Sequence, residues 1–336
     1  MALPPPIRAA ARRLLPLVAA PLFALLASCD AVVLAPSGDI AARQRDLLLV
    51  STGLMLLIII PVIALIVVFA WKYRQSNKAA EYKPDWDHST YLEVAIWGAP
   101  LLIIICLGAV TWAGTHLLDP YRPLDRIDHN RPTSEAVAPL EVQVAALDWK
   151  WLFIYPEYGI ATINEVAAPV DRPIRFTITA SSVMNSFYIP ALAGQIYAMP
   201  GMQTTLYGVI NETGEYKGFS ANYSGAGFSG MRFAFHGLPQ AGFDQWVAQV
   251  RSGGQGLDRP TYLRLAAPSE NVPVAHFSGV DASLFDAVVN MCVRPGQTCG
   301  SHMSGHMPAE PETARDPRQT HQIVPEPPAH MAGAAH

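Results

Sequence analysis

Charged residues are scarce in this sequence, and two long stretches contain none of them. Asp, Glu, Lys and Arg make up 15% of the 336 residues, whereas 51% are hydrophobic. The net charge is −4 and there is no block of basic residues, which argues against nucleic acid as a partner. The four cysteines form no Cys-x-x-Cys pair, so the common metal and redox motifs of that spacing are absent.

The two stretches without Asp, Glu, Lys or Arg are Leu47–Trp71 and Val94–Leu118, each 25 residues long. A helix of that length extends roughly 37 Å at about 1.5 Å per residue, enough for ~30 Å of hydrocarbon. Only a helix satisfies its own backbone in lipid, and membrane helices tolerate proline. The sequence therefore predicts a transmembrane hairpin over residues 47–118, with spans 47–71 and 94–118 joined by the loop 72–93.

Residues 1–28 have the parts of an export signal. Three arginines precede an apolar core over 14–26, which is too short to span a membrane. The sequence Leu-Ala-Ser-Cys then ends at Cys29 and resembles the lipobox of bacterial lipoproteins. That resemblance implies cleavage before Cys29 and acylation of its thiol; the alternative is an incidental cysteine beside an ordinary cleavage site. An acylated Cys29 places the segment 29–46 in the periplasm and the loop 72–93 in the cytoplasm.

Glu93 is the charge nearest the cytoplasmic start of the second span. One interpretation is an interfacial carboxylate that the dipole of the helix N-terminus stabilises. The other is an ionisable group that feeds protons into a membrane pathway. From the residues alone, the interfacial interpretation is favoured.

An all-β pattern over 139–238 follows a linker at 119–138. Turn-rich pieces separate short strand-like runs at regular spacing, which predicts a β-sandwich or barrel. Helical periodicity then predicts a C-terminal helical extension over 239–294. The tail 295–336 is rich in Pro, Ala, Gly, His and Met and is predicted to be disordered. The strand-like runs are Leu140–Ala146, Lys150–Ile154, Ile174–Thr179, Asn185–Ile189, Thr204–Val209 and Met231–His236, and the helical ones are Ala241–Arg251 and Ala282–Met291.

Histidines and cysteines near the C-terminus leave alternatives open. His302 and His306 are weak candidates for copper ligands, and a solvated extension is favoured over copper capture. Cys292 and Cys299 either form a disulfide or remain free thiols or ligands. Two further histidines, His236 and His276, have no partner histidine nearby in sequence and are interpreted as ordinary surface or core residues.

Three motifs carry a resemblance to a known family. Asp148–Trp151, Ser182–Pro190 and Gln195–Met202 resemble subunit II of haem–copper terminal oxidases, and the likeness extends over roughly residues 26–292. That family joins two transmembrane helices to a cupredoxin domain outside the membrane. The resemblance therefore implies a membrane-anchored α plus all-β fold, in which a cupredoxin-like Greek-key β-sandwich follows the hairpin.

Cytochrome c oxidases of that family hold a binuclear copper site in this domain, and here the matching positions are altered. The two cysteines, the glutamate and the histidine of the copper loop correspond to serines, an asparagine and a phenylalanine, and the earlier histidine to an asparagine. Neutral hydroxyls and an aromatic ring cannot replace thiolates and imidazole as copper ligands. We therefore expect no metal in this chain. The ligand-equivalent positions are Asn185, Ser220, Asn222, Ser224, Phe228 and Met231, of which only Met231 matches.

These changes point to the quinol-oxidising branch of the family. Asn222–Gly225, Gly227–Met231 and Tyr197–Met199 resemble subunit II of cytochrome bo-type ubiquinol oxidases, as does the lipobox. In that family ubiquinol gives electrons directly to haem in subunit I, so haems and copper are expected in the partner subunit. The resemblance also favours proton uptake over a purely interfacial role for Glu93.

The expected assembly follows from the same resemblance. Its members would be the catalytic subunit I, small membrane subunits and membrane lipid, in a bacterial inner membrane with the N-terminus and C-terminal domain in the periplasm. Trp149 and Trp151 are interpreted as packing or subunit-contact residues, since no copper lies behind them. The rival interpretations are a copper-bearing cytochrome c oxidase subunit II and a free-standing copper-binding lipoprotein.

Overall fold

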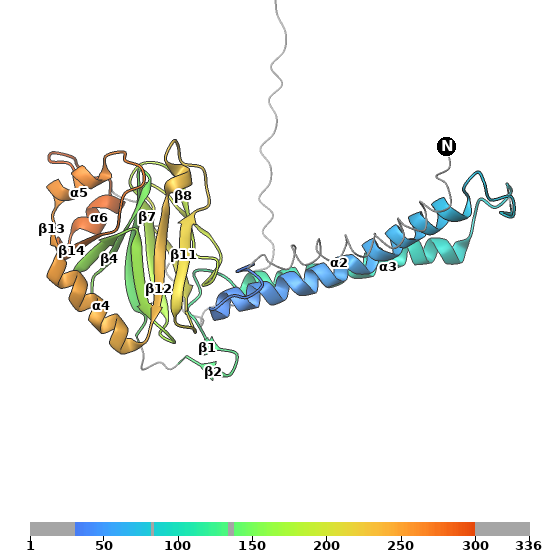
Figure 1. Ribbon diagram of the computed structural model, residues 1–336, viewed down its shortest axis with the longest axis horizontal. Coiled ribbons are helices and arrows are strands. Elements are labelled where there is room, and N and C mark those ends of the chain that lie inside the picture. The colour runs from blue at the N-terminus through green and yellow to red at the C-terminus, as the bar shows by residue number, and fades with distance from the viewer. Residues whose placement is uncertain (1–30, 82–83, 134–137, 300–336) are drawn as a thin grey trace, which may run out of the picture. The chain divides into compact units, whose positions relative to one another are not determined.

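The computed structural model describes residues 31–81, 84–133 and 138–299, and it opens with two long helices (Figure 1). Helix α2 comprises Asp39–Lys72 and helix α3 comprises Thr90–Leu117. Both are long and apolar enough to cross a membrane, by length and composition. Most of their large hydrophobic side chains are exposed, as lipid-facing side chains would be. The expected signal segment and nearly all of the expected tail lie outside the described residues.

Helix α2 begins at Asp39 rather than at the start of the uncharged run, Leu47. Asp39 accepts hydrogen bonds from Arg43 Nε at 2.8 Å and from Arg126 Nε at 3.0 Å, and its side chain is only 4% exposed. A backbone bridge between Gly38 and Ile210 ties this end of the helix to the β domain. The first turns of α2 therefore contain charged residues, and several of these are paired. The apolar pattern of the sequence does not extend over these turns and so could not predict them.

The β domain is a sandwich of two sheets. One sheet has the order β10-β7-β3-β4-β5-β14-β13 and the other β6-β12-β11-β8-β9; β1 and β2 form a separate ribbon. The predicted β-sandwich is confirmed, and each predicted strand run overlaps an observed strand. The strands are β1 Arg126–Asp128, β2 Arg131–Pro132, β3 Leu140–Leu147, β4 Lys150–Tyr155, β5 Ile160–Ile163, β6 Glu165–Pro169, β7 Ile174–Ala180, β8 Asn185–Tyr188, β9 Ile196–Ala198, β10 Thr204–Gly208, β11 Gly214–Ser220, β12 Arg232–Leu238, β13 Gln255–Leu257 and β14 Ala275–Val280.

Aromatic rings fill the core between the two sheets. Trp151 and Phe153 project from β4, and Phe187 and Phe233 face them from the other sheet. The rings of Phe187 and Phe233 are stacked with centroids 5.3 Å apart, and Trp151 meets Phe187 edge-on at 5.3 Å. Offset and edge-on pairs of this kind add stability beyond the area that they bury.

The segment expected to be a helical extension, 239–294, is in fact mixed. Helices α4 (Gln240–Gly253), α5 (Arg259–Ala266) and α6 (Leu284–Val289) alternate with β13 and β14, which lengthen the seven-stranded sheet. Strand β13 has only three residues, and most residues of both strands are exposed or half-exposed, so the two strands lack the apolar alternation that would predict them. A second core, which includes Leu152, Ile154, Tyr262 and Phe285, forms where α5 and α6 cover the outer face of the sheet (Figure 1).

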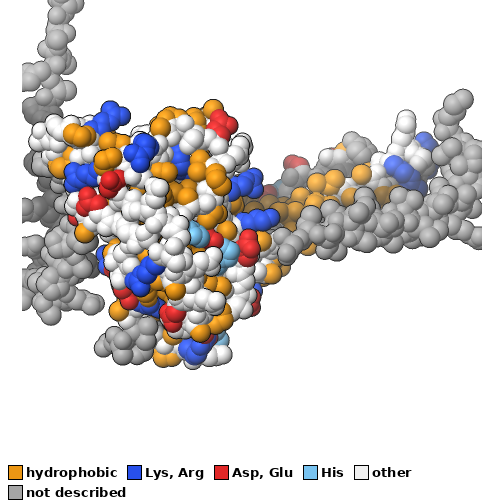
Figure 2. Space-filling view, turned by 60° about the vertical axis from the view of Figure 1, so that its left-hand side comes forward, with side chains coloured by type: hydrophobic (Ala, Val, Ile, Leu, Met, Phe, Trp, Pro, Cys, Tyr) orange, Lys and Arg blue, Asp and Glu red, His pale blue; other side chains and the backbone are white. Residues whose placement is uncertain are grey.

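The surface agrees with a membrane anchor joined to a water-exposed domain. Figure 2 shows hydrophobic side chains along the helices and charged side chains of both signs interspersed over the sandwich. Interspersed charges keep a domain soluble, whereas an apolar helix surface suits lipid.

Candidate functional site

The ligand-equivalent positions converge at one end of the five-stranded sheet. Asn185 begins β8, Ser220 ends β11, and Met231 directly precedes β12. Strand β11 pairs with both β8 and β12, and the backbone N–H of Ser220 donates to the Met231 carbonyl at 3.1 Å. The loop 221–231 between β11 and β12 carries the remaining three positions. The strand order therefore brings together residues that lie far apart in the chain.

Hydrogen bonds connect the polar side chains at these positions. Ser220 Oγ donates to Asn185 Oδ1 at 3.1 Å, and Asn185 Nδ2 donates to the Val183 carbonyl at 3.1 Å. Asn222 Nδ2 donates to the Met184 carbonyl at 3.2 Å. Asn185 and Ser220 are 2% and 4% exposed. Because buried polar groups are costly when unpaired, this pairing stabilises Asn185 and Ser220 in their buried positions without any ligand.

The other positions hold Met231, Phe228 and Ser224. Met231 is buried in the core, and Phe228 is half-buried with its ring 5.6 Å from that of Tyr223. Ser224 Oγ is buried without a hydrogen-bond partner among the described residues. Within that same part of the chain, no group of three His, Cys, Asp or Glu side chains is arranged to hold a metal ion.

The two tryptophans of the first motif have different surroundings. Trp151 is fully buried between the sheets. Trp149 is half-buried, and its Nε1 donates to the Ser224 carbonyl at 3.0 Å. Both side chains therefore make packing contacts within this domain.

Glu165 joins two histidines that sequence reasoning treated as unrelated. Its Oε1 lies 3.2 Å from His236 Nε2 on β12, and its Oε2 lies 2.6 Å from His276 Nε2 on β14. Trp246 Nε1 on α4 donates to Oε2 at 3.3 Å. No local pattern could have revealed this cluster, since Glu165 and His276 are 111 positions apart.

The electrostatics of the Glu165 cluster follow from these contacts. Burial alone would raise the pKa of Glu165, but the hydrogen bonds from His236 and His276 outweigh it and lower the pKa to about 2. The hydrogen bond to Glu165 raises the pKa of His236 above its usual value, against the opposing effect of burial. The cluster thus favours a carboxylate beside a protonated imidazole.

Glu93 lies in the first turn of α3. Its side chain is 52% exposed, and its Oε1 lies 2.7 Å from Nδ1 of His88. The pair joins an acid and a base near the end of an apolar helix. His88 was not singled out from the sequence, because five positions separate it from Glu93 and it precedes the helix.

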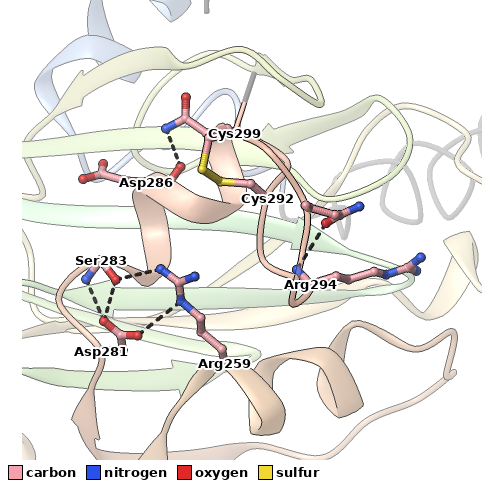
Figure 3. Close-up of a disulfide and its surroundings, with 9 residues drawn as sticks. Arg259, Asp281, Ser283, Asp286, Cys292, Arg294 and Cys299 are labelled. Atoms are coloured by element: carbon pink, nitrogen blue, oxygen red, sulfur yellow. Dashed lines mark hydrogen bonds and ion pairs between the residues drawn. A yellow bond between two sulfur atoms is a disulfide. The ribbon is translucent and has the colours of Figure 1, made fainter. Parts of the chain in front are cut away.

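Cys292 and Cys299 form a disulfide, with Cα atoms 4.7 Å apart (Figure 3). Of the alternatives left open by the sequence, the structure has the disulfide, which links two positions seven residues apart just after α6. Cys106 is a free thiol exposed on α3. Cys29, His302 and His306 lie outside the described residues.

Two family profiles match the β domain. "Cytochrome C oxidase subunit II, periplasmic domain" matches residues 155–237, and "COX Aromatic Rich Motif" matches residues 251–296. The periplasmic domain of subunit II of cytochrome oxidase from Bradyrhizobium japonicum covers 35% of this chain and 94% of its own, with 23% identity and a TM-score of 0.32. That score is too low to carry any argument.

Relatives by sequence cover most of the chain. Cytochrome bo(3) ubiquinol oxidase subunit 2 of Pseudomonas putida is 53% identical over 79% of this chain and 82% of its own. The subunit of the same name from Pseudomonas aeruginosa is 49% identical over 86% of this chain and 85% of its own. Ubiquinol oxidase subunit 2 of Acetobacter aceti is 51% identical over 79% of this chain and 84% of its own. At this identity and coverage, the chain belongs to the family of subunit II of cytochrome bo-type ubiquinol oxidases.

Proposed function

We propose that this chain is the metal-free subunit II of a proton-pumping ubiquinol oxidase of the aerobic respiratory chain. It would support the catalytic subunit that oxidises ubiquinol and reduces oxygen to water. The observation that carries the proposal is the hydrogen-bonded pair Ser220–Asn185 at two ligand-equivalent positions. Neutral hydroxyl and amide groups offer electrons no acceptor, so the electrons would pass directly to haem in the partner.

The proposed location is a bacterial inner membrane. Helices α2 and α3 would dock on the catalytic subunit, with small membrane subunits and lipid covering the remaining apolar surface. Both the N-terminus, acylated at Cys29, and the β domain would lie in the periplasm. The exposed hydrophobic side chains of both helices support this arrangement.

Glu93 is the proposed point at which protons enter a path into the catalytic subunit. Its carboxylate has a histidine 2.7 Å away, and both groups are exposed at the loop side of α3. An exposed acid–base pair can collect protons from water, and an ionisable group at a membrane helix end can pass them inward.

Purification of the assembled complex tests the function. The tagged chain, isolated in mild detergent, should bring haem with it, and the preparation should consume oxygen with ubiquinol but not with reduced cytochrome c. Metal analysis should find no copper beyond that of the catalytic subunit. Turnover with reduced cytochrome c and extra copper would instead identify a copper-bearing cytochrome c oxidase subunit. A preparation without haem, whose copper disappears when residues 295–336 are deleted, would identify a free-standing copper-binding lipoprotein.

A further inference from the structure

An exposed segment between α5 and β14, residues 267–272 (the strap), is fastened at both ends by buried side chains. Lys150 Nζ donates to the Ala267 carbonyl at 2.9 Å, and Asn164 Nδ2 donates to the Val272 carbonyl at 2.7 Å. Lys150 is 1% exposed and Asn164 is 8% exposed. A buried ammonium costs free energy unless its donors are used, and Lys150 uses a second one on the Asp148 carbonyl at 2.9 Å. Hydrogen bonds from two buried side chains of the sandwich therefore hold both ends of the strap in place.

The strap lies against the loop 221–231 without space between them. A Cβ added to Gly227 would lie 2.8 Å from Glu270 Cγ, and one added to Gly230 would lie 2.6 Å from Asn271 Oδ1. Real Cβ atoms essentially never come this close to another heavy atom. A side chain at either position would therefore have to displace the facing side chain, that of Glu270 or Asn271, from its present place.

Trp149 is the third part of this contact. Its ring lies 2.6 Å from where a Cβ on Gly227 would be, and its Nε1 donates to the Ser224 carbonyl at 3.0 Å. Its backbone has a φ of 67°, a left-handed conformation that is unfavourable for a bulky side chain. Such a conformation persists only where the surroundings hold it. Here the preceding carbonyl, that of Asp148, accepts hydrogen bonds from Lys150 Nζ and from the Ser269 amide of the strap.

Beyond Ala221, the loop 221–231 makes few hydrogen bonds to residues far away in the chain. Its internal backbone bonds are short turns, such as Phe228 N to Gly225 O at 3.2 Å and Gly230 N to Gly227 O at 3.1 Å. Single turns of this kind are marginal in water without tertiary contacts. We propose that the strap and Trp149 hold the loop 221–231 in its folded conformation, and that Lys150 is the positioning residue that fixes both to the sandwich. This proposal goes beyond the proposed function, because it rests only on contacts within the β domain.

Amide hydrogen exchange in the purified complex tests the contact between strap and loop. Gly230→Ala should raise exchange in both segments about tenfold, because the new methyl group displaces Asn271. Asn271→Gly removes that side chain and suits the φ of 50° at this position, so the double variant Gly230→Ala/Asn271→Gly should exchange within about threefold of the wild type. Gly256→Ala is the matched control, since nothing lies within 4 Å of its added Cβ.

Two further variants test the roles of Trp149 and Lys150. Trp149→Phe keeps a ring but loses the bond to Ser224, and should raise exchange in the loop about fivefold. Lys150→Met should raise exchange in the strap and the loop together. If Lys150→Met does not fold, the Gly230 and Asn271 variants decide whether the proposal holds. Wild-type exchange in Gly230→Ala, failure of the double variant to restore protection, or a strap that opens while the loop stays protected would each overturn the proposal.

Discussion

By resemblance, Ser220 and Asn185 stand at positions expected to hold metal-binding side chains in copper-bearing proteins, and here Ser220 Oγ donates a hydrogen bond to Asn185 Oδ1. A thiolate and an imidazole left without metal would be reactive and poorly paired, whereas a hydroxyl and an amide both donate and accept. Their burial at 4% and 2% is therefore compatible with a stable domain. From the chemistry of these two residues we expect this end of the sheet to have a structural role and to carry no electrons.

Glu93 gives the first prediction at this scale. Glu93→Gln keeps the size and hydrogen bonding of the side chain but removes its negative charge. We expect turnover with ubiquinol to fall roughly tenfold, equivalent to ~1.4 kcal/mol on the rate-limiting barrier. Oxygen consumption by the purified complex measures this, with haem content as the check on assembly. Asp87→Asn removes a charge from the same loop and should leave turnover unchanged. Wild-type turnover in Glu93→Gln would return the residue to an interfacial role.

Cys29 gives the second prediction at the scale of single residues. Mass spectrometry of the mature protein should find a chain that starts at Cys29 and carries the mass of acyl groups. Cys29→Ala should lose that mass yet remain in the membrane fraction, because two transmembrane helices anchor a protein far more firmly than acyl chains do. An unmodified Met1 start, or cleavage at another bond, would contradict the prediction.

Among the elements, β6, β12, β14 and α4 meet at the Glu165 cluster. Strands β6 and β12 belong to the five-stranded sheet and β14 to the seven-stranded sheet, so the carboxylate connects the two layers. Its neighbours are His236 from β12, His276 from β14 and Trp246 from α4, and Glu215 of β11 faces His236 across the ladder. Removal of one partner from an ion pair that is partly shielded from water costs more stability than removal of one from an exposed pair.

Stability should therefore depend on pH through this cluster. The pKa of Glu165 is lowered, so its contribution is present above pH ~4.5 and is lost as the pH falls towards about 2. The pKa of His236 is raised, so its contribution is complete below pH ~6.5 and is lost as the pH rises through the raised value. The cluster should stabilise the domain most between these limits.

Thermal melts of the purified protein from pH 3 to pH 9 measure this effect. Glu165→Gln should lower stability by about 3 kcal/mol near pH 5.5, as an order of magnitude from the shift in the pKa of Glu165. It should also flatten the pH profile. Glu157→Gln is the control, because Glu157 is 51% exposed in a surface pair with Arg172 and should change little. A Glu165→Gln profile parallel to that of the wild type would rule out the cluster as its source.

At the scale of the whole molecule, the segment after the sandwich strands (residues 239–299, the C-terminal arm) covers one face of the larger sheet and forms a second hydrophobic core. Helices α5 and α6 cover the outer side of the seven-stranded sheet, and every residue of β4 is consequently buried. The Cys292–Cys299 disulfide closes this arm behind α6. The ligand-equivalent positions thus lie in a domain that is packed on both sides of its larger sheet, and we expect its fold to be independent of metal.

Restoration of the ligands tests that expectation. The combined variant would carry Asn185→His, Ser220→Cys, Asn222→Glu, Ser224→Cys and Phe228→His beside Met231. It should bind copper and turn purple, because the strand order already brings these positions together. The same variant without Ser224→Cys lacks a bridging thiolate and should not form the purple centre. Stoichiometric copper in the wild-type chain, or a restored loop that folds and binds none, would contradict the expectation.

Local patterns in the sequence determined the two apolar helices, six strands of the sandwich and the altered copper motif. Length without charge, alternation of apolar residues and motif spacing are properties of neighbouring residues, so they can be read without coordinates. Strand β11 escaped detection because most of its residues are exposed or half-exposed. The disulfide was left open for a related reason, since spacing alone does not set the distance between two Cα atoms.

Only the tertiary structure decided which residues far apart in the chain contact one another. Lys150 carries a charge yet is buried beneath the strap, and His236 and His276, which have no partner histidine nearby in sequence, share Glu165. Strands β13 and β14 likewise depend on a sheet edge that the earlier strands provide. Each of these features arises between segments far apart in the chain, where the free energy of a contact depends on neighbours that local sequence does not specify.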